Sequence, residues 1–554
     1  MFDFEGRTLS KERAQAYFDQ GVWTNESFVD VLKRNADLHP DLVHKDEERS
    51  LTYRELWNEV ETVAAGLFEL GVRRGDKVAI QLPNTLDYIV AVFAASRIGA
   101  VSVSLQIDLG RHAIVRSLEQ SGAKIWIVAD NYRGQPLYDM ALEVRSLVPS
   151  LERIVLQGDA SRAKEGTLSF SSLRSGERRV PEQELEANRA QPLDGFLMVF
   201  TSGTTGSPKG VVHLHANYLW AARAYAKNFG YETGDTVLGL APIYHQTGML
   251  AGVLMTIAVC GRILLLDRFS ANRVLSWIES EKPNFLVGAP PHVIHVSNAP
   301  NLQTTDTSSI KLFIYAGAPV PSAVLQRLQS EGGFKVGCMF GWTEGLVVVA
   351  TRPEDSLEAI SSTVGLQIPG LEVKLVDEEG RELTDPVAEG EMWARGPNFS
   401  AGYYRNAAAA NRQWDEEGWF RSGDLLRRDA NGRYSFIARA DDVINRGGTK
   451  IDPKVVEDAI AAHEAVQMIA VVGAPHETLG QQLVACIVLK EGAQPFSPAE
   501  MRDFLGSRGL AKFQFPDQLR FLPELPMTNS GKIKKKDLRE WLAREQSNGG
   551  AEQE

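Results

Sequence analysis

The sequence contains little cysteine, no long apolar run and an excess of negative charge. Only three of its 554 residues are cysteines, and Cys260, Cys338 and Cys486 lie far apart without a CxxC pair. This spacing excludes a disulfide framework and a cysteine-based zinc site, and it is typical of a protein from a reducing cytoplasm. The formal net charge of -12 disfavours nucleic acid as a partner, because binding to a phosphate backbone needs a basic face.

Membrane insertion is also disfavoured. The longest apolar stretch, residues 249–260, is too short and too interrupted to span a bilayer, and it is interpreted as a buried helix. The first residues mix charged and apolar side chains and lack the apolar core of a signal peptide. We therefore expect a cytoplasmic protein with no membrane partner.

From about residue 51 the pattern alternates amphipathic helices with short apolar strands. Such alternation predicts parallel sheets covered by helices, which is an α/β fold. A polar stretch, residues 158–193, is expected to be a surface excursion before the sheet resumes at Phe196. The strands are expected at 77–81, 100–104, 124–128, 284–287, 311–315 and 335–340.

The pattern changes in the last third of the chain. Short strands and glycine-rich turns in residues 371–438 predict a β-rich, barrel-like subdomain of a large N-terminal domain that spans residues 1–438. A small α+β C-terminal domain is expected over residues 441–542. The polar residues 543–554 are expected to be disordered.

Residues 201–210, Thr-Ser-Gly-Thr-Thr-Gly-Ser-Pro-Lys-Gly, are the most informative stretch, and we expect them to lie between a strand and a helix. Such a loop can direct backbone N–H groups, hydroxyls and one cation onto a polyanion such as a nucleotide triphosphate. It is not a Walker A loop, because Pro208 precedes Lys209 and Gly210 follows it. By local composition alone, a plain surface turn is an equal alternative.

Five further blocks accompany this loop. Residues 315–319 end a predicted strand in small residues that leave room for a flat ring, and residues 340–344 end the next strand with an aromatic ring and a carboxylate. Ligands of open parallel sheets lie beyond the carboxyl ends of the strands, so both blocks lie where a nucleotide would bind. The other blocks are Arg-Ser-Gly-Asp at 421–424, residues 439–448 around a domain boundary, and a lysine on the glycine-bearing loop 526–532.

In this order and spacing, the six blocks resemble the adenylate-forming superfamily of acyl- and aryl-CoA synthetases, NRPS adenylation domains and firefly luciferase. The resemblance covers residues 31–538. It implies that ATP, with Mg²⁺, activates a small-molecule carboxylic acid to an acyl-adenylate with release of pyrophosphate. Transfer to coenzyme A would then release AMP. The resemblance also implies a mobile C-terminal domain, and it leaves a homodimer open.

The resemblance further implies roles for individual residues. Those expected around the nucleotide are Thr201, Ser202, Gly203, Thr204, Thr205, Gly206 and Lys209 at the phosphates, Gly317, Ala318, Pro319, Phe340 and Gly341 at adenine, and Asp424 with Arg439 at ribose. Those expected to take part in catalysis are Thr343 at the α-phosphate, Glu344 on Mg²⁺ and Lys532 in the first half-reaction. Asp441 would be the hinge, and Gly447 and Gly448 would line the thiol path.

Histidine residues bear on the substrate. His245 follows Tyr244 at a position where amino-acid-activating relatives have a Phe-Asp pair, so an amino-acid substrate is disfavoured. Dihydroxybenzoate-activating relatives tend to carry asparagine in this block, so His245 also counts against that subclass. CoA ligases commonly place a histidine there against the acyl pocket, so His245 is a candidate site residue. The pairs His213/His215 and His292/His295 lack a visible third metal ligand and are interpreted as structural.

Three functions remain open. The leading one is a carboxylic-acid:CoA ligase for a medium-chain, alicyclic or aromatic acid, since residues 17–32 and 445–451 resemble such ligases. Thr449 stands where the family often has glutamate, and this departure leaves open how the chain handles the thiol acceptor. The second is an acyl-AMP ligase that loads a carrier protein. The third, a non-catalytic or luciferase-like nucleotide-binding protein, is disfavoured by the intact Lys209, Glu344, Asp424 and Lys532.

Overall fold

The computed structural model describes residues 2–175, 180–201, 208–446, 449–476, 478–527 and 533–549. The chain divides into two compact units. Unit 1 comprises Met1–Lys374, Trp393–Arg421 and Asn431–Tyr434, and unit 2 comprises Leu375–Met392, Ser422–Ala430 and Ser435–Glu554.

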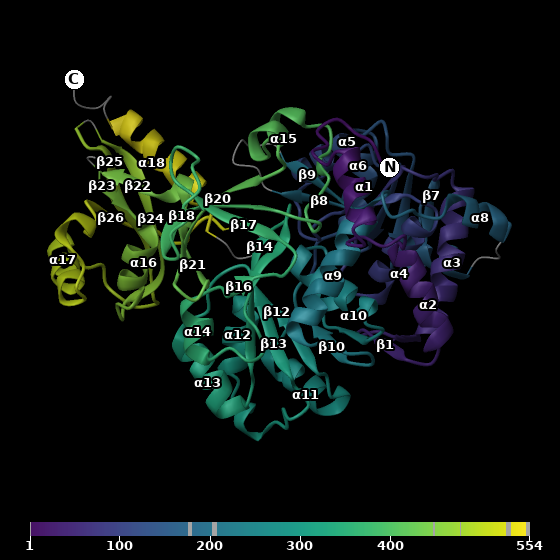
Figure 1. Cartoon of the computed structure of the whole chain (residues 1–554), viewed down its shortest axis with the longest axis horizontal. Coiled ribbons are helices and arrows are strands. Elements are labelled where there is room, and N and C mark those ends of the chain that lie inside the picture. The colour runs from purple at the N-terminus through teal and green to yellow at the C-terminus, as the bar shows by residue number, and fades with distance from the viewer. Residues whose placement is uncertain are drawn as a thin grey trace. The chain divides into compact units, whose positions relative to one another are not determined.

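Unit 1 contains an eight-stranded and a nine-stranded sheet (Figure 1). In spatial order, the first consists of β19 (Gly402–Tyr403), β9 (Lys209–Leu214), β8 (Gly195–Thr201), β4 (Val101–Ser104), β3 (Lys77–Gln81), β5 (Ile125–Ala129), β6 (Arg153–Gln157) and β7 (Thr167–Ser169). The second consists of β16 (Leu366–Gln367), β15 (Leu346–Ala350), β14 (Val336–Trp342), β13 (Leu312–Ala316), β12 (Phe285–Gly288), β10 (Thr236–Gly239), β11 (Arg262–Leu265), β1 (Val43–Lys45) and β2 (Ser50–Thr52). The central strands of both sheets pair in parallel, which confirms the predicted α/β fold class.

Helices cover these sheets as the alternating pattern predicts. Helix α4 (Leu86–Arg97) is buried along its whole length, in keeping with its apolar sequence. Helix α9 (His215–Phe229) contacts β9 of one sheet and β15 of the other, so it lies between them. The other α-helices of unit 1 are α1 (Lys11–Asp19), α2 (Phe28–Leu38), α3 (Tyr53–Glu69), α5 (Arg111–Ser121), α6 (Leu137–Arg145), α7 (Phe170–Ser175), α8 (Glu182–Asn188), α10 (Met255–Ala258), α11 (Ala271–Glu281), α12 (Pro290–Ser297), α13 (Ser322–Gly332), α14 (Leu357–Ser362) and α15 (Ala407–Gln413).

The edge of the eight-stranded sheet is covered by the start of the chain. Thr8 donates a backbone hydrogen bond to the Ala401 oxygen, and Tyr403 donates one to the Gly6 oxygen. Strand β19 is thus paired with β9 on one side and bonded to the N-terminal segment on the other.

Two local expectations need correction. The stretch 158–193 is not only a surface excursion, because it contributes strand β7 and helices α7 and α8. The apolar stretch 249–260 is helical and largely buried as expected, but the helix type differs, because Thr247–Leu254 forms a π-helix that continues into α10. In a π-helix each N–H bonds to the carbonyl five residues back, and such turns are frequent at functional sites.

The β-rich region predicted for residues 371–438 is a four-stranded sheet with a linear strand order. That order is β17 (Glu372–Val376), β18 (Ala388–Arg395), β20 (Phe420–Arg428) and β21 (Tyr434–Arg439).

The C-terminal part of unit 2 is an α+β structure around a mainly antiparallel sheet. One face of strands β24 (Val466–His476) and β25 (Gly480–Leu489) packs with residues of α16 (Pro453–Ala461) and α17 (Pro498–Ser507), and the opposite face packs with residues of α18 (Lys535–Gly549). The expectation of disorder for residues 543–554 needs correction, because residues 543–549 continue helix α18, which ends at Gly549. The elements are β22 (Ile444–Arg446), β23 (Thr449–Ile451), α16 (Pro453–Ala461), β24 (Val466–His476), β25 (Gly480–Leu489), α17 (Pro498–Ser507), β26 (Gln518–Phe521) and α18 (Lys535–Gly549).

Among the described residues, no helix combines the length and the apolar character needed to cross a membrane.

Candidate active site

The candidate phosphate loop joins two antiparallel strands. Thr201 ends β8, Lys209 begins β9, and these two residues are paired in register. The loop therefore leads into a strand before helix α9 begins, which corrects the expected strand-to-helix connection. Five loop residues assigned to phosphate binding lie outside the described part of the chain: Ser202, Gly203, Thr204, Thr205 and Gly206.

Lys209 and Glu344 are linked through Tyr403. The Lys209 ammonium lies 5.0 Å from the centroid of the Tyr403 ring. The Tyr403 hydroxyl donates a hydrogen bond of 2.6 Å to Oε1 of Glu344, a carboxylate that is only 9% exposed. Burial and the nearby negative charge of Glu344 raise the pKa of Tyr403 well above its ordinary value, so the hydroxyl stays protonated.

The turn that carries Thr343 and Glu344 is held by hydrogen bonds to its backbone. The Nε2 atom of His213 lies 2.8 Å from the Thr343 carbonyl oxygen, and the Nδ2 atom of Asn217 lies 2.9 Å from Nδ1 of His213. Because the Asn217 amide can only donate at this atom, His213 accepts at Nδ1 and donates from Nε2. The backbone N–H of Ser400 donates a further hydrogen bond of 2.7 Å to the backbone carbonyl oxygen of Glu344.

His213 and its neighbour His215 are fully buried, and burial lowers the pKa of each to about 3. Both rings are therefore neutral at physiological pH.

The described residues contain no group of three or more His, Cys, Asp or Glu side chains arranged to hold a metal ion. The pair His292 and His295 packs against the Phe269 ring at 4.6 and 6.0 Å.

The two blocks assigned to adenine lie side by side. Gly317, Ala318 and Pro319 follow β13 and are exposed, and Phe340 and Gly341 belong to β14, the parallel neighbour of β13. A side chain at Gly341 would bring its Cβ to 1.7 Å from the Leu346 oxygen, so only glycine fits at this bulge.

His245 lies between β10 and the π-helix. Its ring is 4.8 Å from the Tyr244 ring. The Ser104 hydroxyl, at the end of β4, donates a hydrogen bond of 3.0 Å to the backbone carbonyl oxygen of Tyr244. The next residue, Gln246, has both polar side-chain atoms buried without a partner among the described residues. The structure thus places His245 after β10 and beside the end of β4, at the carboxyl ends of strands from both sheets of unit 1.

In unit 2, Asp424 and Arg439 form the expected pair. The Arg439 Nε atom donates to Oδ1 of Asp424 at 2.7 Å, and the Asp424 side chain is 5% exposed. The backbone of Asp441 lies in a short 3-10 helix, Ala440–Asp442, but its side chain is outside the described set. Gly447, Gly448 and Lys532 also lie outside the described residues.

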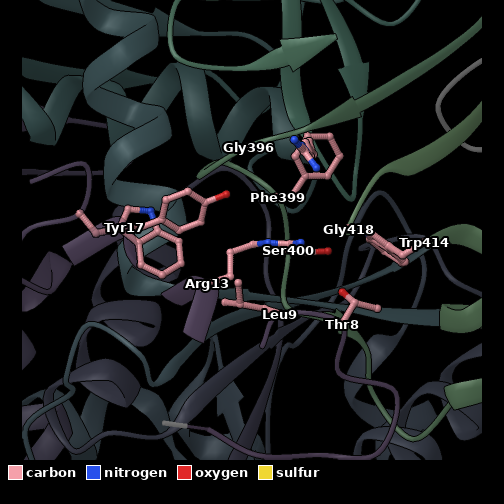
Figure 2. Close-up of a pocket in the computed structure, with 11 residues that line it drawn as sticks. Thr8, Leu9, Arg13, Tyr17, Gly396, Phe399, Ser400, Trp414 and Gly418 are labelled. Atoms are coloured by element: carbon pink, nitrogen blue, oxygen red, sulfur yellow. The ribbon is translucent and has the colours of Figure 1, made fainter. Parts of the chain in front are cut away.

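The cavity in Figure 2 is too small to hold a substrate. Its volume is about 20 Å³, and Figure 2 shows Arg13, Tyr17 and Ser400 around it. A space of this size admits roughly one water molecule. Because the buried Ser400 hydroxyl has no partner in the described part of the chain, such a water would satisfy it.

Three contributors to this site were missed or undervalued from the sequence: Tyr403, Gln246 and the role of His213 on the Thr343 carbonyl. Tyr403 and Gln246 carry no motif of their own, and nothing in the sequence around His213 indicates that its ring contacts the Thr343 carbonyl.

Comparison with known proteins places most of the chain in one enzyme family. The family described as AMP-binding enzyme matches residues 32–404, and the family described as AMP-binding enzyme C-terminal domain matches residues 455–532. The medium-chain fatty-acid–CoA ligase of Escherichia coli (strain K12) is 31% identical over 539 residues, which cover 97% of this chain and 94% of that protein. The 2,3-dihydroxybenzoate-AMP ligase of Bacillus subtilis (strain 168) is 29% identical, with 96% of each chain covered.

A solved structure agrees with these relatives. The anthranilate CoA ligase AuaEII, in complex with anthranoyl-AMP, superposes with a TM-score of 0.83 at 26% identity and covers 95% of this chain and 98% of its own.

Proposed function

Because this chain belongs to the AMP-binding enzyme family of adenylate-forming ligases, we propose that it is an AMP-forming carboxylic-acid:CoA ligase. ATP would activate the acid to an acyl-adenylate with release of pyrophosphate, and coenzyme A would then displace AMP. The substrate would be a medium-chain, alicyclic or aromatic acid, in line with a medium-chain fatty-acid–CoA ligase and an anthranilate CoA ligase among the similar proteins. We also propose a cytoplasmic location, in keeping with three free, buried cysteines.

The observation that carries this proposal is the cluster of Lys209, Tyr403 and Glu344. It puts a cation and a buried carboxylate on the same tyrosine, at the start of the strand that follows the candidate phosphate loop. A carboxylate that attacks the α-phosphate brings two anions together, so the site must supply positive charge. We propose that Lys209 supplies part of it and that Lys532 adds a second cation during adenylation.

Mg²⁺ fits these residues as an ion that arrives with the nucleotide. This ion usually keeps several waters and binds one or two carboxylates together with substrate phosphates, rather than a cage of protein ligands. Glu344 is a single buried carboxylate whose position is fixed by the Tyr403 hydroxyl, and no larger ligand cluster occurs in the described residues. When bound, Mg²⁺ would neutralise phosphate charge and would be held by Glu344.

The remaining residues would orient the reactants. We propose that Thr343 contacts the α-phosphate, that Asp424 accepts hydrogen bonds from the ribose hydroxyls with Arg439 holding its carboxylate, and that His245 lines the acyl pocket. Residues 317–319 with Phe340 and Gly341 would enclose adenine. Asp441 would be the hinge of the C-terminal domain, whose Gly447 and Gly448 would line the thiol path after Lys532 has left. Positioning of this kind supplies most of the catalysis in phosphoryl-type transfers.

A second candidate differs only in the acceptor. The relatives include an AMP ligase as well as CoA ligases, and Thr449 stands where CoA ligases often have glutamate. An acyl-AMP ligase that loads a carrier protein is therefore the alternative.

The two candidates are separated by one assay. A panel of acids is supplied with ATP and Mg²⁺, pyrophosphate release is measured, and AMP and thioester are then followed with and without coenzyme A. We expect acid-dependent pyrophosphate release, and AMP release and acyl-CoA that depend on coenzyme A. Pyrophosphate release without acyl-CoA, together with acylation of a phosphopantetheinylated carrier protein, would establish the alternative. No pyrophosphate with any acid would contradict both, and a Lys209→Ala variant is the inactive control.

A further inference from the structure

Tyr403 is the side chain that touches both charged groups of the candidate site. It is fully buried, and its backbone is held from two sides, because β19 pairs with β9 while the Tyr403 N–H donates to the Gly6 oxygen at 3.1 Å. The Trp414 ring packs edge-on against its ring at 5.1 Å. These contacts restrict the ring to one position.

The two ends of Tyr403 make chemically different contacts. The ring face meets the Lys209 ammonium at 5.0 Å, which is a cation–π contact, and the hydroxyl donates to the Glu344 carboxylate at 2.6 Å. A hydrogen bond to a carboxylate is charge-assisted and is about twice as strong as a neutral one. The length of one rigid side chain therefore sets the separation between the cation and the carboxylate.

The two charged groups come from different sheets. Lys209 begins β9 of the eight-stranded sheet, whereas Glu344 follows β14 of the nine-stranded sheet. The link through Tyr403 therefore fixes the position of the strand that follows the phosphate loop relative to the turn that carries Glu344. His213, on the same strand as Lys209, adds a second link through the Thr343 carbonyl.

We propose that Tyr403 is a positioning residue that orients the Glu344 carboxylate toward the metal ion of the metal–ATP substrate. This inference rests on the proposed function of the site. The two ends of the side chain have different roles in this proposal. The hydroxyl orients the carboxylate that would hold the metal ion, and the ring contacts the Lys209 ammonium.

The test compares ATP binding with and without the metal. Tyr403→Phe removes the hydroxyl and keeps the ring, so Glu344 loses its donor while Lys209 keeps its aromatic contact. We expect the dissociation constant of ATP, measured by titration calorimetry, to rise about tenfold in Mg²⁺ and to stay at the wild-type value in EDTA. The Mg²⁺ concentration that gives half-maximal pyrophosphate release should rise in parallel.

Tyr218→Phe is the matched control. Tyr218 is also a fully buried tyrosine of unit 1, but its hydroxyl has no hydrogen-bond partner among the described residues. Both dissociation constants should therefore stay unchanged in this variant. A Tyr403→Leu variant, which also removes the ring, should weaken ATP binding in EDTA as well, provided that its melting temperature shows a folded protein.

The outcomes distinguish the positioning role of Tyr403 from the proposed ligase function. If Tyr403→Phe weakens ATP binding equally in Mg²⁺ and in EDTA, or weakens neither, the positioning role is wrong although the ligase assignment stands. If the wild-type protein binds no ATP under either condition, the proposed function fails and the inference fails with it.

Discussion

Three buried histidines should make the protein sensitive to mild acid. Burial lowers the pKa of His44, His213 and His215 to about 3, whereas a histidine in an unfolded chain titrates near 6.5. Between these values the unfolded chain binds protons that the folded protein does not, so stability is fully present above pH 6.5 and falls as the pH drops toward 3. Integrated from neutral pH to pH 5, the loss is about 2 kcal/mol for each histidine.

His44 and His215 are suited to test this. Each accepts a backbone N–H at Nδ1, from Ile263 at 3.1 Å and from Phe28 at 3.3 Å, and a protonated ring could not accept either bond. In the variants His44→Asn and His215→Asn the amide oxygen can replace Nδ1 as the acceptor, and it does not titrate.

The assay is the number of protons taken up on unfolding at pH 5, obtained by calorimetry in buffers of different ionisation enthalpy. Each variant should take up about one proton fewer than the wild type, because an unfolded histidine is almost fully protonated at this pH. His112→Asn, on the exposed face of α5, is measured in parallel as the control for the exchange of histidine for asparagine itself. Wild-type uptake in both buried-site variants would refute the reasoning.

Three further predictions concern the reaction. Lys532→Ala should slow adenylation about a hundredfold, as loss of an oxyanion-type donor does, yet form thioester nearly normally from pre-made acyl-adenylate; equal loss in both steps would make Lys532 structural. Asp441→Pro, which restricts φ at the proposed hinge, should spare pyrophosphate exchange and depress thioester formation, and parallel loss of both would argue against a hinge. His245→Ala should change the ranking of acids in the pyrophosphate assay more than the KM for ATP, and the reverse pattern would remove His245 from the acyl pocket.

The general architecture could be predicted because its signals are local. Apolar strands alternate with amphipathic helices, and parallel neighbours bring their carboxyl ends to one edge. Residues 317–319 and 340–344 could therefore be expected together, and their strands β13 and β14 do pair in parallel. A β-rich region and an α+β C-terminal part could be predicted for the same reason, since their turns are marked by glycine, but the β-rich region is a sheet with a linear strand order and not a barrel.

The rest depends on contacts that a linear pattern does not contain. Strand β9 is six residues long and runs directly into α9, so its short apolar sequence does not by itself mark a strand between the loop and the helix. The π-helix at Thr247–Leu254 has an apolar sequence that an α-helix would share. Tyr403 lies 59 positions from Glu344, and a lone tyrosine shows its partner only when the two sheets are in place.

The cover that the N-terminal segment gives to the eight-stranded sheet has a practical consequence for recombinant work. Residues 6–8 occupy hydrogen-bonding groups beside β19 that would otherwise face solvent. An uncovered strand edge is a template for pairing with another chain. A shortened clone that starts after Thr8 would leave exposed the outer side of β19, the two-residue strand to which Tyr403 belongs. Insoluble expression of such a clone would then be a property of its boundary, and it should not be taken as evidence about the catalytic site.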